Sequence, residues 1–202
     1  MNKGIYVHIP FCKSRCVYCG FYSTTHAELC HRYTKALLHE MELRSSVEAS
    51  LSHYNTGTVY LGGGTPSVLD LSDMELIFHK INAVYPGNMR EVTVEMNPDD
   101  VTPQYVSALK SFGVNRISMG VQSFDDNRLR FLRRRHSASQ AIKAYNIIRQ
   151  AGIGNISIDL MFGFPKENIG DWQNDIKTAL SLDPTHISAY CLMYAEGPPL
   201  HK

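Results

Sequence analysis

The sequence lacks the features that mark several classes of protein. No apolar run approaches the roughly 20 residues that a membrane-spanning helix needs, and the N-terminus has no long apolar segment typical of a secretory signal. The 20 basic and 19 acidic side chains nearly cancel and are mixed along the chain, which argues against a nucleic-acid-binding surface. We therefore expect a cytoplasmic protein with no nucleic-acid partner.

Cysteine is scarce, and its distribution is uneven. Of the five cysteines, three fall within eight residues, at positions 12, 16 and 19. A secreted disulfide protein usually carries an even and dispersed set, so this cluster predicts a metal or redox site in a reducing compartment. Cys30 and Cys191 stand apart and are interpreted as buried free thiols.

Short segments rich in β-branched residues alternate with longer amphipathic segments from end to end. No repeat, low-complexity tract or linker interrupts this pattern, so we expect one domain. Parallel strands joined by right-handed crossovers would follow, in either a partial (β/α) barrel or a doubly wound sheet. The expected strands are 4–9, 58–61, 91–96, 116–119, 155–160 and 186–191. The expected helices are 28–49, 72–84, 103–112, 137–151 and 171–182.

Capping residues predict where the helices begin and end. The second helix is expected to begin around Ser72, the third to be capped by Thr102, and the fifth to be opened by Asp171. Gly113 and Gly152 follow the third and fourth helices, where glycine commonly ends a helix.

Most of the unusual residues follow a predicted strand. The cysteine segment 12–19 follows the first strand and the glycine-rich segment 62–66 follows the second. Glu95 ends the third strand, Gln122 follows the fourth, and Asp159 lies near the end of the fifth. Because the carboxyl ends of parallel strands meet at one edge of the sheet, these residues predict a single ligand site there.

The segment 12–19 has the spacing CxxxCxxC. Three thiolates can bind three irons of a cubane cluster and leave the fourth iron open to a substrate or cofactor. The alternative is a structural zinc site completed by Cys30, His26 or His31, although such sites favour paired CxxC motifs.

This segment, with the aromatic Tyr18 before its third cysteine, resembles the radical S-adenosylmethionine (radical SAM) superfamily. Further motifs resemble one branch of it, the oxygen-independent coproporphyrinogen III oxidase family, in the same order along the chain. They are YVHIPFC at 6–12, GGGTPS at 62–67, VEMNP at 94–98, GVQSF at 120–124, IDLMFGFP at 158–165 and DW at 171–172.

The resemblance covers essentially the whole chain, and it implies the fold. We expect an α/β protein, a partial (β/α)6 TIM-like barrel of the radical SAM type, with residues 1–202 forming one core domain. The chain has no helix pattern after the last expected strand and finishes with 196–202, rich in proline. We therefore expect it to be truncated before the C-terminal region, with the C-terminal domain of the family absent.

The resemblance also implies the cofactors and the residues that hold them. It implies a [4Fe–4S] cluster on Cys12, Cys16 and Cys19, and one or two molecules of S-adenosyl-L-methionine (SAM). In the family, SAM chelates the open iron and is split to methionine and a 5′-deoxyadenosyl radical. The residues that match contacts to the first SAM are Tyr6, Gly62, Gly63, Gly64, Thr65 and Glu95. Those that match contacts to a second SAM are Tyr18, Gly64, Thr65, Gln122, Arg134 and Asp159, with Met193 matching loosely.

Several neighbours of these residues are given ordinary structural roles. Arg133 and Arg135 flank Arg134 and are interpreted as solvating a helix face. His8 is interpreted as a core histidine. Glu95 taken without the resemblance would be read as a salt-bridge partner. No residue is assigned as catalytic, and whether the chain is itself an enzyme is left open.

The family divides into true oxidases and relatives that resemble HemW-type haem chaperones. The oxidases convert coproporphyrinogen III to protoporphyrinogen IX by decarboxylating two propionates, and they have a fourth cysteine two residues after the third. Phe21 occupies that position here, and Ser123 stands where oxidases tend to have aspartate. The segment 197–200 also resembles the chaperone branch, whereas Gly20 departs from the aspartate found there.

The favoured interpretation is a chaperone that binds haem and passes it to apo-haemoproteins, with haem bound in the full-length protein. The expected partners are haem or a porphyrin, an apo-haemoprotein acceptor, and an electron donor such as flavodoxin or ferredoxin. The alternatives are the oxidase activity and a purely electron-transferring iron–sulfur module. The module is disfavoured because it would need no SAM-contacting residues.

Overall fold

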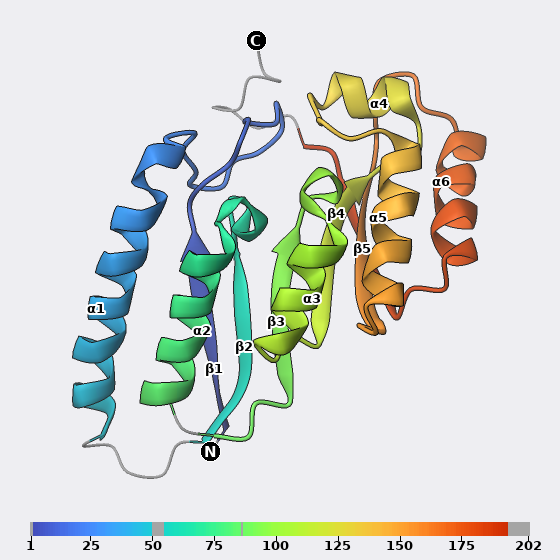
Figure 1. Ribbon diagram of the computed structural model, residues 1–202. Coiled ribbons are helices and arrows are strands. Elements are labelled where there is room, and N and C mark those ends of the chain that lie inside the picture. Colours follow the sequence, from blue (N-terminus) through green and yellow to red (C-terminus); the bar gives the residue numbers. More distant parts are fainter. Residues whose placement is uncertain (1, 50–54, 86, 194–202) are drawn as a thin grey trace.

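The sheet is open, curved and entirely parallel in the computed structural model, which describes residues 2–49, 55–85 and 87–193 (Figure 1). The described strands pair strictly in chain order, from β1 to β6. A doubly wound sheet would reverse its order at a switch point, so the partial barrel is confirmed. The strands are β1 (Asn2–Ile9), β2 (Asn55–Gly63), β3 (Glu91–Met96), β4 (Arg116–Gln122), β5 (Asn155–Phe162) and β6 (His186–Cys191).

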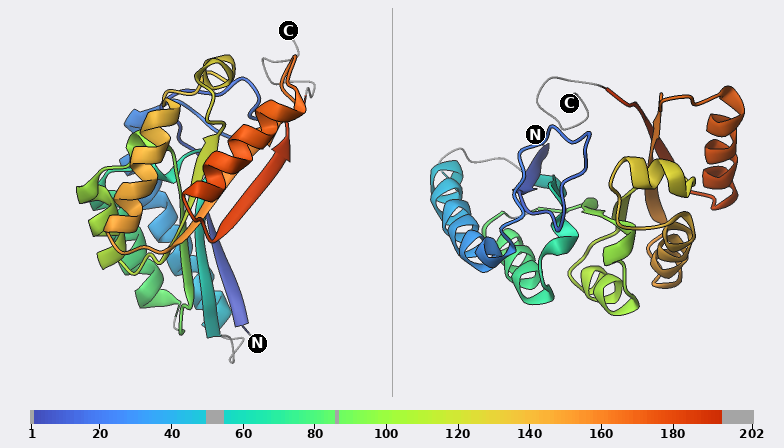
Figure 2. Two further views of the ribbon diagram at one scale, coloured as in Figure 1. Left: turned by 90° about the vertical axis from the view of Figure 1, so that its right-hand side faces the viewer. Right: turned by 90° about the horizontal axis from the view of Figure 1, so that it is seen from above.

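The helices cover the convex face of the sheet, as the view from above shows (Figure 2). The α-helices are α1 (Cys30–Ala49), α2 (Leu71–Val84), α3 (Pro103–Ser111), α4 (Asp126–Phe131), α5 (Ala138–Gln150) and α6 (Ile169–Ser181). Three single 3₁₀ turns are η1 (Ala27–Leu29), η2 (Pro66–Val68) and η3 (Pro98–Asp100). In the part of the chain that the structure describes, no helix is long and apolar enough to cross a membrane.

The two faces of the sheet differ in chemistry because side chains alternate along each strand. On β3, Val92, Val94 and Met96 are buried toward the helices, and equivalent apolar residues of β4 and β5 continue this layer. The alternate residues Thr93 and Glu95 point to the concave side. The outer face therefore forms the hydrophobic core, and the inner face carries polar groups suited to a ligand.

The structure corrects two of the predicted helix starts. Asp70, and not Ser72, caps α2, because its side chain accepts a hydrogen bond from Asp73 N. Asn168 caps α6, and Asp171 lies at the third helical position, where it completes a reciprocal capping box. The predicted cap at Thr102 is confirmed.

The glycines that follow α3 and α5 have positive φ values, 97° at Gly113 and 82° at Gly152, as the sequence predicted. The short helix α4 was not predicted. The predicted features at 196–202 and 197–200 lie outside the described residues.

Candidate cofactor site

A cavity of about 530 Å³ opens at the carboxyl ends of the strands. This volume is within the usual range for sites that hold small molecules and cofactors. Segments far apart in the sequence meet there, as expected for one edge of a parallel sheet. The sequence-predicted residues that line it are Cys12, Cys16, Tyr18, Cys19, Gly63, Gly64, Thr65, Glu95, Gln122, Arg134, Asp159 and the loosely matched Met193.

The three clustered cysteines are free thiols on one wall of this cavity. Thr65 Oγ1 lies 3.5 Å from Cys12 Sγ, and Arg134 Nη1 lies 3.6 Å from Cys16 Sγ, so both thiols face hydrogen-bond donors. Burial raises the pKa of the Cys19 thiol, and the neighbouring Cys12 and Cys16 raise it further. A cationic metal centre would relieve this repulsion between thiolates.

The arrangement does not fit a zinc site. Among residues 2–49, 55–85 and 87–193, no three His, Cys, Asp or Glu side chains could hold a metal ion together. His26 is bonded instead to Glu28 at 2.9 Å, and His31 to Asp73 at 3.0 Å. In a cubane each thiolate binds a different iron, so the ligands lie further apart than at one zinc ion. Three free thiols lining one cavity are the donor set that such a cluster takes.

The glycine-rich loop after β2 lies directly against the cysteine segment. Gly64 N donates to Ile9 O at 2.8 Å, and a Cβ on Gly64 would lie 2.8 Å from Phe11 O. Gly63 has φ 118°, a conformation that residues with a side chain rarely adopt. Only glycine allows this loop both its turn and its close approach to the end of β1.

Glu95 lines the cavity and is held by two hydrogen bonds. Its carboxylate accepts from Tyr60 OH at 2.7 Å and from Gly63 N at 3.1 Å. Burial raises the pKa of Glu95, and Asp159 across the cavity raises it further. Within the described ranges no Lys or Arg pairs with Glu95, so the salt-bridge interpretation is wrong.

Asp159 is the second carboxylate of the cavity, and it too has no Lys or Arg ion pair within the described ranges. Burial raises its pKa, while hydrogen bonds from Ser188 and from Ser118 Oγ, at 3.3 Å, lower it. Two carboxylates at one cavity, neither paired with a Lys or Arg among the described residues, favour a positively charged ligand. The ammonium and sulfonium groups of SAM have this charge.

The unliganded protein should gain stability when Asp159 is made neutral. Since the folded-state pKa of Asp159 is raised, its favourable contribution is present below the unfolded pKa and is lost as pH rises through the folded value. We expect Asp159→Asn to raise the Tm of the cofactor-free protein at about pH 7.5, with a gain that shrinks toward about pH 4.

Thermal unfolding followed by circular dichroism across this pH range checks the expectation, with Glu75→Gln on the exposed surface of α2 as the control. A Tm difference for Asp159→Asn that stays constant with pH would contradict it.

Arg134 reaches into the cavity from the segment between α4 and α5. Its Nη2 donates to Asn97 Oδ1 and to Gly120 O, both at 2.5 Å, which fixes the guanidinium at the ends of β3 and β4. Its Nε is buried and has no hydrogen-bond partner among the residues that the structure describes. A buried guanidinium with an unused donor beside a cavity is suited to binding a carboxylate.

Gln122 ends β4 with φ 73°, which is unusual for a residue with a side chain. The next two residues hold this turn, because Ser123 Oγ donates to Asp175 at 2.7 Å and Phe124 N donates to it at 2.8 Å. Arg128 Nη1 lies 3.3 Å from the same carboxylate. This buried network fixes the conformation that places Gln122 at the cavity.

Three residues first interpreted from the sequence do not line the cavity: Gly62 on β2, and Tyr6 and His8 on β1. Tyr6 is exposed and stacks on Tyr60 with ring centroids 6.0 Å apart. His8 is half-buried, not a core residue; it accepts from Tyr6 OH at 3.2 Å and donates to Tyr22 O at 3.0 Å. Together they support the β1 side of the site without lining it.

The predictions for Cys191 and Arg135 are wrong. Cys191 is exposed at the end of β6 and lines the cavity together with Met193, so it is not a buried thiol. Cys30 is half-buried. Arg135 does not solvate a helix face, because it forms ion pairs with Asp99 and Asp100.

Several lining residues were not selected from the sequence as site residues, among them Asn97 and Ser118. Ser118 could have been found from strand alternation, since it precedes Gly120 by two residues on the same face of β4. Asn97 could have been found from its place directly after β3, two residues after Glu95 in the sequence.

A match to a protein-family model shows which family the chain belongs to. The model described as "Radical SAM superfamily" matches residues 6–179. The chain belongs to the radical SAM superfamily. Members of this superfamily bind a [4Fe–4S] cluster and SAM, and most of the residues predicted to contact them line this one cavity.

The radical SAM chain is similar to proteins of haem metabolism. It is 37% identical over 194 residues to the haem chaperone HemW of Bacillus subtilis, covering 95% of this chain and 50% of that protein. It is 31% identical to the oxygen-independent coproporphyrinogen-III oxidase-like protein HemZ of the same organism, covering 98% of this chain and 41% of that protein. The chain thus spans about half the length, or less, of these curated relatives.

Among solved structures, the coproporphyrinogen III oxidase HemN of Escherichia coli, a radical SAM enzyme, matches with a TM-score of 0.87 and 26% identity. The match covers 95% of this chain and 44% of that one. The parallel barrel found here is therefore the radical SAM fold.

Proposed function

We propose that this chain forms the cluster- and SAM-binding barrel of a HemW-type haem chaperone, which binds haem and passes it to apo-haemoproteins. The observation that carries the proposal is Phe21 at the mouth of the cavity. It occupies the position where the resemblance places the fourth cysteine of the true oxidases. Its side chain is 70% exposed and lines the cavity, where it offers a ring and no thiol.

The packing behind Gln122 supports the same branch. Ser123 is fully buried and donates to Asp175, whose second oxygen accepts from Phe124 N. An aspartate in place of Ser123, as oxidases tend to have, would bring two carboxylates together in this buried position. The serine is therefore matched to its surroundings here.

The residues of this chain would act on the cofactors in distinct ways. Cys12, Cys16 and Cys19 would hold the cluster, which supplies one electron for the cleavage of SAM when both are bound. Glu95 and Asp159 would bind the cationic groups of SAM, and Arg134 would bind a carboxylate group. Gly63 and Gly64 allow the backbone to approach the ligand closely.

Three further parts of the proposal concern the whole protein. The haem site would lie in the part of the relatives that this chain does not span, and residues 1–202 would be the radical SAM core. The haem acceptor would be an apo-haemoprotein, and the electron donor a flavodoxin or a ferredoxin. The protein would work in the cytoplasm.

The alternative is coproporphyrinogen III decarboxylation, which the likeness to E. coli HemN favours. Two assays on the full-length gene product, reconstituted anaerobically, separate the two functions. We expect haem binding in a spectroscopic titration, and no protoporphyrinogen IX from coproporphyrinogen III when SAM and reductant are supplied. Conversion at a rate that falls in Cys12→Ala would contradict the chaperone proposal and establish the oxidase.

A further inference from the structure

Asp100, at the end of η3, is an acidic residue that the chemistry described above does not use. Its side chain is 1% exposed, and its carboxylate receives donors from three separate segments. Lys13 Nζ lies 2.6 Å from Oδ1, Ser67 Oγ lies 2.9 Å from Oδ2, and Arg135 Nη2 lies 3.3 Å from Oδ1. Asp100 therefore joins loops that follow β1, β2 and α4.

Each of these donors is next to a part of the cofactor site. Lys13 lies between Cys12 and Cys16, the first two of the three clustered cysteines. Ser67 ends the GGGTPS segment, and its hydroxyl also accepts from Asn97 N at 3.3 Å. Arg135 follows Arg134, which contacts Cys16 Sγ.

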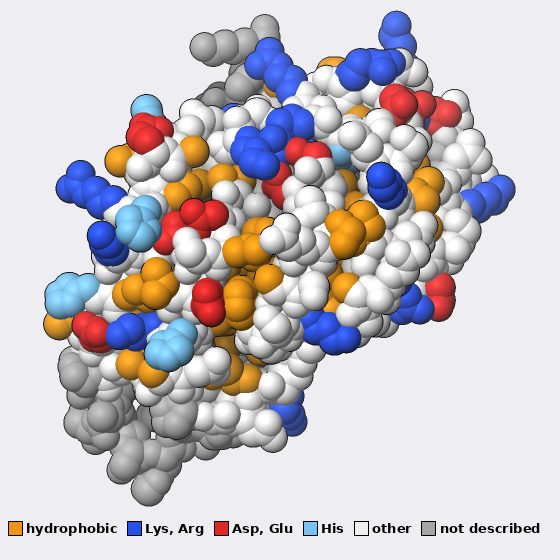
Figure 3. Space-filling view, viewed as in Figure 1, with side chains coloured by type: hydrophobic (Ala, Val, Ile, Leu, Met, Phe, Trp, Pro, Cys, Tyr) orange, Lys and Arg blue, Asp and Glu red, His pale blue; other side chains and the backbone are white. Residues whose placement is uncertain are grey.

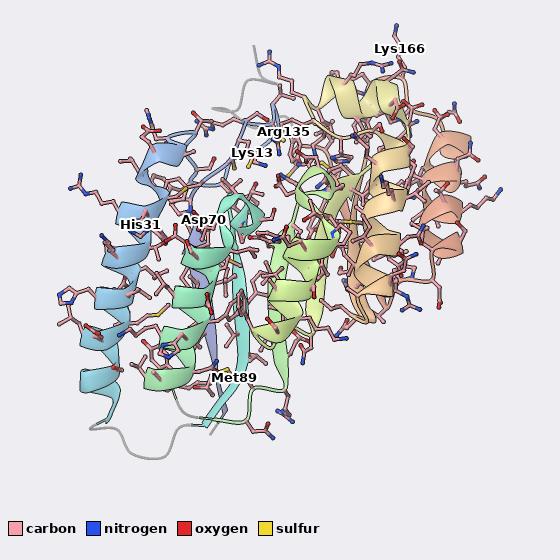
Figure 4. The ribbon with its side chains drawn as sticks, viewed as in Figure 1. Lys13, His31, Asp70, Met89, Arg135 and Lys166 are labelled. Atoms are coloured by element: carbon pink, nitrogen blue, oxygen red, sulfur yellow. The ribbon has the colours of Figure 1, made fainter. Side chains whose placement is uncertain are left out.

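Figure 4 shows Lys13 and Arg135 close together at the end of the sheet, above α2 and α3. In the same region of Figure 3, basic and acidic side chains lie side by side at the surface. The side chain of Lys13 is 47% exposed, so its cation reaches the buried carboxylate from the solvent side. Asp100 thus connects the half-exposed Lys13 of the cysteine segment to the buried Ser67.

Residues 12–23 form no helix and no strand. Around the first two cysteines the backbone is held by Cys12 N, which donates to Thr24 O at 2.9 Å, and by Val17 N, which donates to Leu132 O at 3.4 Å. The thiols of Cys12 and Cys16 also face Thr65 and Arg134. Lys13 lies between Cys12 and Val17, and its bond to Asp100 is charge-assisted. Such bonds are stronger than those between neutral groups.

We propose that Asp100 is a positioning residue that holds the segment between Cys12 and Cys16 in the conformation that binds the cluster. It acts through Lys13 on the cysteine side and through Ser67 on the side of the glycine-rich loop. It touches neither the thiols nor the cavity. The inference rests on the three cysteines as cluster ligands, and it is independent of the haem-chaperone proposal.

The test measures iron release from the anaerobically reconstituted protein in excess chelator. We expect Asp100→Asn and Lys13→Gln each to speed release about tenfold, the scale of a charge-assisted hydrogen bond. The double variant should release iron no faster than the faster single variant, because both changes break the same bond. Asp99→Asn, which removes a neighbouring partner of Arg135 and leaves the bond to Lys13, should release iron at close to the wild-type rate.

Two further measurements separate positioning from general stability. The Tm of the cluster-free Lys13→Gln protein should stay near the wild-type value, since Lys13 is largely at the surface, while its reduced cluster should show an altered electron paramagnetic resonance (EPR) spectrum. If Asp100→Asn fails to fold, the release rate and EPR spectrum of Lys13→Gln decide the question. Wild-type release from Lys13→Gln, or additive effects of the two substitutions, would overturn the proposal.

Discussion

Replacement of Cys12, Cys16 or Cys19 with alanine is expected to reduce the iron of the reconstituted protein from about four atoms per chain to background. Each thiolate would bind a different iron, so no remaining pair of cysteines could hold the cubane. The measurement is iron and sulfide analysis after anaerobic reconstitution, with the visible absorbance of the cluster as a second readout.

The other two cysteines provide matched controls. Cys30→Ala should keep the full iron content, because Cys30 begins α1 and does not line the cavity. Cys191→Ala is the more demanding control, since Cys191 lines the same cavity as the three ligands. Cluster loss in Cys191→Ala, or a full cluster in Cys16→Ala, would show that the ligand set was assigned incorrectly.

The second large effect is expected at Glu95, which should bind SAM and not the cluster. Glu95→Ala should weaken SAM binding about tenfold or more, since a hydrogen bond to a charged group contributes about 1.5–3 kcal/mol. The iron content should not change. Equilibrium titration of the reconstituted protein with SAM provides the measurement.

Glu91→Gln is the matched control for Glu95, because it lies on the same strand and on the same face but at the opposite end of β3. It should leave SAM affinity unchanged. An identical SAM titration curve for Glu95→Ala and the wild type would show that Glu95 does not contact SAM.

Much of the fold could be predicted from local patterns. The bounds of β3 and β6 are those expected, because a β-branched or aromatic run bounded by turn residues is a local signal. Strand order could not be read in this way. Alternating strands and helices fit a doubly wound sheet equally well, and only the pairing of each strand with the next in sequence separates the two folds.

The helix starts show where local signals compete. Ser72 and Asp171 are good capping residues, yet Asp70 and Asn168 cap the helices. In both cases the actual cap lies two or three residues earlier, and the residue chosen from the sequence lies in the first turn. Helix α4 has six residues, too few for an amphipathic period to be recognised.

The candidate site was predicted as a set of positions, and the structure adds the relations between them. The edge of a parallel sheet brings the cysteine segment, the glycine-rich loop and Glu95 together wherever such strands are correctly recognised. The burial of Asp100 and its bonds to Lys13 and Arg135 depend on contacts between loops distant in sequence. Local sequence patterns do not show contacts between distant loops. The sequence alone therefore indicates a solvent-exposed Arg135 and not its ion pairs with Asp99 and Asp100.

The exposure of Cys191 has a similar origin. Cysteine is usually buried, but β6 is the last strand of the open sheet and has no described neighbour on its outer side. Cys191, at the end of this edge strand, therefore lies at the margin of the cavity although cysteine is usually buried.

Cys12, Cys16 and Cys19 are expected to hold a cluster whose fourth iron is open to SAM in this cavity. The most direct measurement is the EPR spectrum of the reduced, reconstituted protein with and without SAM. Saturating SAM should change the spectrum of the wild type, and Glu95→Ala should need more SAM to reach the same change. A spectrum that stays the same at saturating SAM would contradict this expectation.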